Sequence, residues 1–354
     1  MKKKIVFLIA LLIICCFATF AQASTEVASE AVTETQVFVD DLGRSVTLPA
    51  NISRVAPSGS NAQVIVFQIA PEKLVGLSSK LTNAEKEIYP KYTHDLPAFG
   101  TLYGKKANLN RETLILANPE VIIDVGDIKG SVEDMVKELD DVSSEVGVPV
   151  IFIEANMHNY DEVFMKLGEL LNCQGRALQL AKYYQNVVEL IKEIRENAEN
   201  KQPRVYITSS NDGLYAILGG KSHSECAEMA GAEVVVTSSL VQSNGNISLE
   251  TLYMQDPEYI FTYTQEGYDT VTSSRDWANI SAVQNGKVYL VPSMPYGFID
   301  SPVCSNRIVG LYYLASIFYP EAGIDIVERT KEFYSLFYGK DLDDEAIKEI
   351  LYLN

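Results

Sequence analysis

Apolar and polar positions along the chain follow a repeating rhythm, in which short apolar runs alternate with segments of helical periodicity. The first half carries short β-rich runs at residues 54–57, 74–78, 121–126 and 149–154, separated by helical patterns at 60–70, 110–118 and 131–147. The run "VIIDVG" at 121–126 is largely apolar, which is typical of a parallel strand buried on both faces. Before these runs, alternating apolar residues flank the turn-forming "DDLG" and predict a short hairpin over residues 37–49.

The second half repeats the rhythm after one long helical stretch at residues 161–200. If continuous, that helix would span roughly 50–60 Å, and Gly175 in "NCQGR" is a candidate break. Strands are then expected at 204–210, 233–239, 258–264 and 287–292, and helices at 222–231, 248–256, 306–320 and 344–354. The alternation predicts an α/β protein with two doubly wound lobes, mainly parallel sheets, a single long connecting α-helix and a ligand cleft between the lobes.

The first residues have the pattern of an export signal and are set apart from the fold. Lys2, Lys3 and Lys4 precede an apolar stretch at residues 5–20, and "AQAS" follows with small residues at a cleavage position near Ala23. The alternatives are an uncleaved membrane anchor, for which 16 apolar residues are short, and a lipoprotein attached at Cys15 or Cys16, where Ile14 is larger than lipobox processing prefers.

The expected organisation follows from these patterns. It comprises a signal peptide at 1–23, a flexible acidic tether at 24–36, an N-terminal lobe at 37–158, a connecting helix at 159–201, and a C-terminal lobe with terminal helices at 202–354. The protein is therefore expected to be secreted or periplasmic after cleavage. Whether it is then soluble or tethered stays open.

Composition narrows the classes of partner. The chain has 354 residues, of which 47% are apolar, enough to bury a sizeable core. Its 29 basic residues less the three lysines of the leader leave 26, against 47 acidic residues, so the exported chain carries a net charge of −21. Nucleic acid and anionic membrane surfaces need a basic footprint and are excluded as partners.

Three cysteines remain after the leader, Cys173, Cys226 and Cys304, and their spacings match no metal signature or disulfide framework. We expect reduced, structural cysteines, with one disulfide plus a free thiol as the alternative.

One short motif occurs twice. Residues 112–123 are "ETLILANPEVII" and residues 250–261 are "ETLYMQDPEYIF", with Glu250 lying 138 positions after Glu112. Each copy predicts a helix that ends at a proline and leads into a strand. A common helix–proline–strand joint repeated by coincidence is one explanation, and a carboxylate at a helix start also stabilises its own helix. The other explanation is that two related lobes present equivalent surface acids to a symmetric partner.

Taken in order, several segments resemble the substrate-binding proteins of bacterial ABC importers for ferric siderophores, haem and cobalamin. The matching pieces extend from about residue 37 to residue 320: "VFVDDLGRSVTLP" with "ISRVAP", "NRETLILANPEVII", "GVPVIFIE", the long helix, "GGKSHSECAEMAG", "SLETLYMQDPEYIF" and "RDWANISAVQNGKVYLVP". Each piece is weak alone, but their order and spacing are fairly specific.

The resemblance implies a monomeric solute-binding component that captures a metal chelate between two lobes and delivers it to an ABC permease dimer in the membrane. It also implies that one glutamate of each lobe docks on the permease, at Glu112 and Glu250. No resident cofactor is expected, because an iron or cobalt chelate would be the transported ligand.

Candidate ligand contacts lie in the loops that follow the predicted strands. Tyrosines there can stack on a chelate or hydrogen-bond to it, and cations can neutralise an anionic one. Arg307 is a candidate because a cation at a helix start opposes the helix dipole, so its position suggests a use other than stability. The predicted ligand-binding set is Ser58, Asn61, Tyr103, Lys105, Lys129, Tyr215, His223, Tyr263, Tyr268, Tyr296 and Arg307. For any one of the tyrosines, half-buried packing is the competing role.

The histidines limit the chemistry further. His94 lies in "YTHDLP" and His158 opens the long helix, so capture of a bare metal ion by clustered imidazoles is disfavoured. His223, in "GGKSH", has two candidate roles: a ligand of haem iron, or a solvated or helix-capping imidazole. The segment "YGFIDSPVCSNR" is long for a siderophore binder and carries a candidate anion site, which leaves a small oxyanion such as molybdate or tungstate as an alternative ligand.

An enzyme of another class, such as a secreted chelatase, would use the same cleft. The sequence contains no nucleophile elbow, no "HExxH" and no phosphate-binding "GxxxxGK". A binding protein rather than an enzyme is therefore expected.

Overall fold

The computed structural model describes residues 34–102, 107–199 and 201–353, and the chain forms a single unit from Thr35 onward. The predicted signal peptide and residues 24–33 of the predicted tether lie outside the described residues. Thr35 and Gln36 were also predicted to belong to the tether, and this is wrong, because they begin strand β1. Within the described residues, none of the helices combines the length and the apolar character that a membrane crossing needs.

The N-terminal lobe opens with the predicted hairpin and continues as a parallel sheet. Strands β1 (Thr35–Val39) and β2 (Ser45–Pro49) pair antiparallel. The sheet has the order β3-β4-β5, formed by β3 (Val55–Pro57), β4 (Val121–Gly126) and β5 (Val150–Glu154). Its helices and 3-10 turns are α2 (Ser60–Ile69), η1 (Pro71–Lys73), α3 (Asn83–Ile88), η2 (Lys91–Thr93), α4 (Arg111–Leu116) and α5 (Val132–Val146). The strand predicted at residues 74–78 is reduced to isolated bridges at Leu74 and Leu77.

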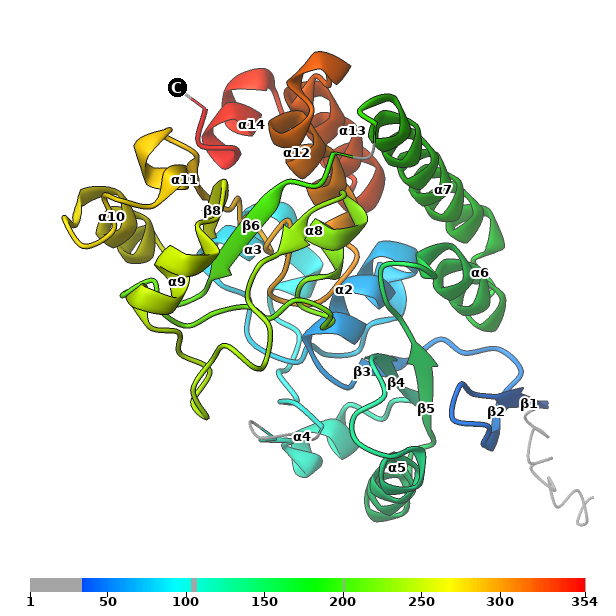
Figure 1. Cartoon of the computed structure of the whole chain (residues 1–354). Coiled ribbons are helices and arrows are strands. Elements are labelled where there is room, and N and C mark those ends of the chain that lie inside the picture. The colour runs from blue at the N-terminus through cyan, green and yellow to red at the C-terminus, as the bar shows by residue number, and fades with distance from the viewer. Residues whose placement is uncertain (1–33, 103–106, 200, 354) are drawn as a thin grey trace, which may run out of the picture. The chain divides into compact units, whose positions relative to one another are not determined.

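The C-terminal lobe contains a second parallel sheet (Figure 1). Its order is β7-β6-β8-β9, formed by β6 (Arg204–Thr208), β7 (Glu233–Val234), β8 (Tyr259–Thr262) and β9 (Val288–Leu290). The helices of this lobe are α8 (Glu225–Met229), α9 (Leu249–Gln255), α10 (Gln265–Ser273), α11 (Ser281–Gln284), α12 (Arg307–Phe318), η3 (Pro320–Ala322), α13 (Ile326–Tyr338) and α14 (Asp344–Ile350). The predicted two-lobed α/β fold with parallel sheets is thus confirmed.

The predicted long connecting helix is present as α7, but the stretch that was expected to be one helix is divided into α6 and α7. Helix α6 (Tyr160–Leu170) ends just before Asn172, which has a left-handed φ of 55°, and α7 (Gln174–Asn197) follows with 24 residues. At 1.5 Å per residue α7 is about 36 Å long, shorter than the predicted stretch. The break falls beside Gly175, as the sequence suggested. Gly168 allows the two helices to pack closely, because a Cβ there would lie 2.2 Å from the Cβ of Ala177.

The repeated motif has the same structure in both lobes. Asn110 caps α4 by accepting a hydrogen bond from the Thr113 N–H, and Ser248 caps α9 by accepting one from the Thr251 N–H. In both copies a residue with a left-handed backbone conformation follows the helix: φ is 48° at Asn118 and 40° at Asp256. These two positions are again 138 residues apart. The two copies are therefore equivalent helix–strand units.

The largest apolar core joins the lobes. It contains Val55, Ile65 and Ile123 from the N-terminal lobe together with Phe261 and Ile308 from the C-terminal lobe. Smaller clusters fill the outer side of each sheet. The central core fixes the two sets of strand ends that face each other.

Cys173, Cys226 and Cys304 are free thiols in the structure, and Cys226 and Cys304 are buried. Burial raises the pKa of Cys226 and of Cys304 to about 12, which keeps both in the thiol form.

Candidate functional site

A cavity of about 370 Å³ lies where segments of the two lobes meet. The N-terminal lobe contributes residues after β3, at the start of α2, at Thr101, and at and beyond the end of β4, while the C-terminal lobe contributes His223 and residues 301–303. The walls are mostly small and polar: Ser58, Ser60, Asn61, Thr101, Asp124, Asp127, Lys129, His223 and Ser301. The carboxyl ends of parallel strands thus form one wall, where ligands of α/β folds usually bind.

Strand β3 leads directly into the floor of this cavity. Ser58 follows β3, is 5% exposed, and its hydroxyl donates a hydrogen bond to the buried carboxylate of Asp124 on β4. Gly59 and Ser60 then begin α2, so the amino end of that helix opens onto the cavity. Backbone N–H groups at a helix start carry partial positive charge and favour anions.

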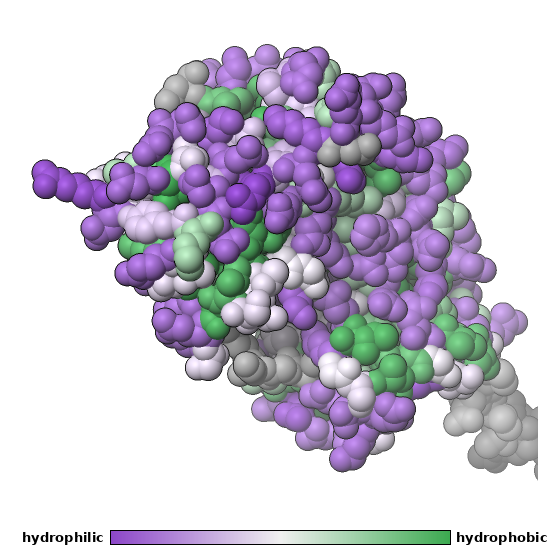
Figure 2. Space-filling view, viewed as in Figure 1, coloured by the Kyte–Doolittle hydropathy of each residue, from purple (hydrophilic) through white to green (hydrophobic). Residues whose placement is uncertain are grey.

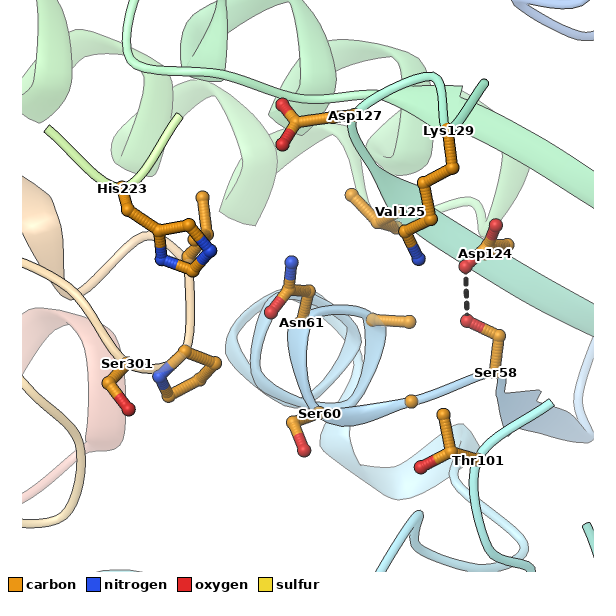
Figure 3. Close-up of a pocket in the computed structure, with 14 residues that line it drawn as sticks. Ser58, Ser60, Asn61, Thr101, Asp124, Val125, Asp127, Lys129, His223 and Ser301 are labelled. Carbon is orange, nitrogen blue, oxygen red and sulfur yellow. Dashed lines mark hydrogen bonds between the residues drawn. The ribbon is translucent and has the colours of Figure 1, made fainter. Parts of the chain in front are cut away.

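His223 stands on the opposite side of the cavity. Its Nδ1 lies 2.8 Å and 2.9 Å from the two carboxylate oxygens of Asp300, whose side chain is 3% exposed. Figure 3 shows the ring facing Asn61, with Lys129 on the far side of the space. The hydrogen bond to Asp300 raises the pKa of His223 above 6.5, outweighing the opposing effect of burial. The contact with Asp300 therefore stabilises the protonated imidazole relative to the neutral one, at a position that faces the cavity.

A second cavity of about 360 Å³ adjoins the first, since His223 and Ser301 line both. Tyr215, Lys221 and Tyr263 belong to this second cavity. The Tyr263 hydroxyl is buried and has no hydrogen-bond partner among the described residues. Burial, reinforced by the charge of Asp300, raises the pKa of Tyr263 well above 10, so its hydroxyl remains a neutral donor.

The structure brings six of the predicted ligand residues together. Ser58, Asn61, Lys129 and His223 line the first cavity, and Tyr215, His223 and Tyr263 line the second. Tyr103 and Lys105 lie outside the described residues.

The other three predicted residues lie elsewhere. Tyr268 lines a separate cavity of about 370 Å³ formed with residues 351–353. Tyr296 is 8% exposed and its hydroxyl lies 2.9 Å from that of Tyr89, inside the protein.

Arg307 is fully buried and does not line either cleft cavity. Its Nη1 lies 2.7 Å from the Ser222 carbonyl and 3.2 Å from a Glu225 carboxylate oxygen, and its Nη2 lies 3.1 Å from the Tyr160 hydroxyl. The carboxylate compensates the cation at the helix start. Arg307 was expected to bind the ligand because a cation is unfavourable at a helix start, and this expectation is wrong. Its guanidinium instead forms hydrogen bonds inside the protein and has a structural role.

Sequence reasoning missed several residues that line the cavities. These are Ser60, Thr101, Asp127, Lys221 and Asp300. All five lie in the loops that were expected to form the cleft, so position relative to the strand ends was the available signal. Nothing in their residue types distinguished them from their neighbours.

The predicted docking glutamates are both exposed in the first turns of equivalent helices. Glu112 lies in α4 and Glu250 in α9. Hydrogen bonds from its own backbone N–H and from Ser248 lower the pKa of Glu250, which keeps that carboxylate charged.

Histidines and acids do not form a metal centre in the part of the chain that the structure describes, where no group of three or more His, Cys, Asp or Glu is arranged to hold a metal ion. His94 instead contacts the Tyr89 carbonyl at 2.9 Å.

Comparison with known proteins adds to this geometry. The family model described as "Periplasmic binding protein" matches residues 58–295. The chain is 24% identical over 339 residues to the molybdate-binding protein MolA of Haemophilus influenzae, covering 86% of this chain and 91% of that protein.

Solved structures give the same result for the fold. An ABC transporter solute-binding protein from Sulfurospirillum deleyianum is 29% identical with a TM-score of 0.80, over 90% of this chain and 99% of that one. CeuE from Helicobacter pylori, in a complex described as Ni-His, is 18% identical with a TM-score of 0.66, over 90% of this chain and 99% of that one.

Proposed function

The chain belongs to the periplasmic binding protein family, and from this premise we propose that it is the extracytoplasmic solute-binding component of an ABC importer, with an anionic metal chelate of the ferric siderophore type as its ligand. The observation that carries the ligand class is the pair of adjoining cavities that meet at His223. The export signal and a monomeric state belong to the same proposal.

The size of the site supports a chelate. The two cavities measure about 370 Å³ and 360 Å³ and share two wall residues, His223 and Ser301. Ligand pockets for small organic molecules measure about 300–1,000 Å³. A bare oxyanion would leave most of this space to water.

The polarity of the site supports an oxygen-rich anion. Hydroxyls, an amide, Lys129, His223 and the carboxylates of Asp124 and Asp127 line the first cavity, and its described lining includes no aromatic side chain. A haem or corrinoid macrocycle presents a large apolar face, which the walls of the first cavity match poorly; the aromatic side chains of the site, Tyr215 and Tyr263, lie in the second cavity. A ferric siderophore presents oxygen atoms and negative charge, which His223, Lys129 and the start of α2 complement.

A small oxyanion is the second candidate. The relative MolA binds molybdate according to its name, and the α2 start beside Ser58 and Ser60 offers the hydrogen-bond donors that such an anion needs.

A thermal-shift panel separates the candidates. Purified protein is mixed with ferric siderophores, haem, cobalamin, molybdate and tungstate, and a ligand present at 100 times its dissociation constant should stabilise the fold by about 2.7 kcal/mol. Stabilisation by ferric siderophores supports the proposal. Stabilisation by molybdate or tungstate alone supports the second candidate, and stabilisation by haem or cobalamin alone would overturn the assignment of an oxygen-rich ligand.

Variants then locate the site. Lys129→Gln and His223→Gln should each lower affinity for the ligand found by the panel, because each removes a positive charge from the cavity. Lys182→Gln is the matched control, since Lys182 is exposed on α7 and lines neither cavity. An equal loss for all three variants would place the ligand elsewhere.

A further inference from the structure

Two exposed apolar side chains occupy equivalent positions in the repeated motif. Leu116 is 79% exposed and Met254 is 76% exposed, the two largest exposed fractions among the large apolar side chains of the described residues. They lie 138 residues apart, at the same offset as Glu112 and Glu250. Neither side chain belongs to an apolar core cluster or lines a cleft cavity.

Each apolar residue shares a helix face with its glutamate. Leu116 follows Glu112 by four positions on α4, and Met254 follows Glu250 by four positions on α9. Residues four apart are neighbours on a helix surface. We call these two sets, Glu112 with Leu116 and Glu250 with Met254, the paired knobs.

Each of the paired knobs is accompanied by a second exposed apolar side chain. Figure 2 shows a mainly hydrophilic face on which hydrophobic side chains gather in separate patches. Ile115 precedes Leu116 at 50% exposure and Tyr253 precedes Met254 at 36% exposure, so each knob adds a second apolar side chain. Apolar surface that is exposed beside a charge at two equivalent places indicates contact with another protein.

We propose that the paired knobs bind the importer's permease, and that Leu116 and Met254 supply most of the affinity while Glu112 and Glu250 mainly orient and accelerate the encounter. The inference rests on the proposed function, because that function names the partner. Equivalent units in two lobes fit a partner with two-fold symmetry, each half of which presents a cation beside an apolar recess.

Charge and solvation explain this division of roles. Exposed ion pairs contribute little to affinity and are screened by salt, but they steer association. Apolar side chains that become buried contribute more, and their loss accelerates dissociation.

Two other occupants fit the charges less well. A second copy of this chain would bring acidic knobs together on molecules that each carry a net charge of −21 once the three lysines of the leader are removed. An anionic membrane surface would repel the same glutamates.

The test measures binding of the purified protein to its importer's permease in lipid nanodiscs. The double variant Leu116→Ser with Met254→Ser should weaken binding by at least about 30-fold, mainly through faster dissociation, at both low and high salt. Glu112→Gln with Glu250→Gln should mainly slow association, by about tenfold at low salt, and this difference should shrink at high salt.

Controls separate a docking effect from general surface effects. Met165→Ser with Leu178→Ser removes two exposed apolar side chains, of 40% and 43% exposure, from α6 and α7 and should leave binding unchanged. All variants should keep the melting temperature and the ligand affinity of the parent protein. Equal weakening by the control pair, or no weakening by the Leu116 and Met254 pair, overturns the inference while leaving the proposed function intact.

A photo-cross-linking experiment tests the symmetry. A benzophenone amino acid is placed at position 116 or at position 254, and the cross-linked peptides are identified by mass spectrometry. Both positions should cross-link to the same segment of the permease subunit, once on each half. Cross-links to a second copy of this chain, or to different permease segments, contradict the inference. If the parent protein does not bind the permease at all, the proposed function fails and the inference fails with it.

Discussion

At the scale of single residues, the contact between His223 and Asp300 connects ligand binding to pH. The hydrogen bond from His223 Nδ1 to Asp300 raises the pKa of the imidazole above 6.5. An anionic ligand should bind most tightly when His223 is protonated and should lose affinity as the pH rises through this raised pKa. Isothermal titration calorimetry between about pH 5 and pH 9 measures the profile.

A substitution at Asp300 tests the cause of this pH dependence. Asp300→Asn removes the carboxylate, so the pKa of His223 should fall and the loss of affinity should move to lower pH. The other groups that influence His223, Arg307 and Asp127, are unchanged by this substitution. His158→Gln is the control, because His158 is exposed and lines neither cavity. Affinity that rises with pH would mean that the ligand requires the neutral imidazole.

Arg307 should matter for stability rather than for the ligand. Arg307→Ala leaves the buried Tyr160 and the partly exposed Glu225 without their cationic partner, which should cost about 3 kcal/mol, the lower end of the range for a broken buried pair. Urea denaturation should show this loss in the free energy of unfolding. Arg275→Ala, at an exposed arginine, should stay within about 0.5 kcal/mol of the parent. A fully stable Arg307→Ala protein that has lost its ligand would restore the original expectation.

Residue type alone could not separate Lys129 from Arg307. Both are cations in loops or at helix starts next to the predicted cleft, and only Lys129 lines the cavity. The direction of Arg307 is set by contacts with Tyr160 and Glu225, which are 147 and 82 residues away in the sequence. Such long-range packing has no local pattern, so the sequence predicted the loops of the site better than its side chains.

At the scale of elements, the two copies of the repeated motif should respond alike to mutation. Asn110→Ala and Ser248→Ala each remove a side-chain acceptor for the first turn of a helix, and each should lower the free energy of unfolding by about 1 kcal/mol. Chemical denaturation of the two variants and of the double variant measures this. The control is Ser243→Ala, at an exposed loop serine that caps no helix of the described residues. Clearly unequal losses would argue against equivalent structural roles.

Local signals in the sequence identified most elements, but some elements that carry such signals were missed. Helix α5 begins at the Ser131 cap and ends at Gly147, whose φ is 69°, and both signals are visible in the sequence. By contrast, residues 74–78 have the apolar pattern of a strand but form only isolated bridges. Tertiary contacts decide that case. Helices α10 and α13 were also not predicted, although Thr264 caps α10 and both the Asp325 cap and Gly339, whose φ is 62°, mark the ends of α13 in the sequence.

At the scale of the whole molecule, the described lobes should move little relative to each other when the ligand binds. One apolar core contains residues of both sheets and of α7, so separating the lobes would expose it to water. Buried polar contacts cross the same region: Ser305 donates a hydrogen bond to Gln68 of α2, and Gln63 of α2 lies 3.4 Å from the Tyr296 hydroxyl. The break between α6 and α7 therefore does not create a free hinge.

This rigidity predicts the outcome of two measurements. In X-ray scattering, the radius of gyration with and without the ligand found by the thermal-shift panel should agree within error, as for other pre-organised binding partners. In hydrogen–deuterium exchange without ligand, α2 and α12 should be among the slowest segments, because most of their residues are buried and belong to the shared core. Gln68→Ala with Ser305→Ala should accelerate exchange in both helices, whereas Lys182→Gln on α7 should not. A large contraction on ligand binding, or rapid exchange in α2, would show that the lobes separate despite their common core.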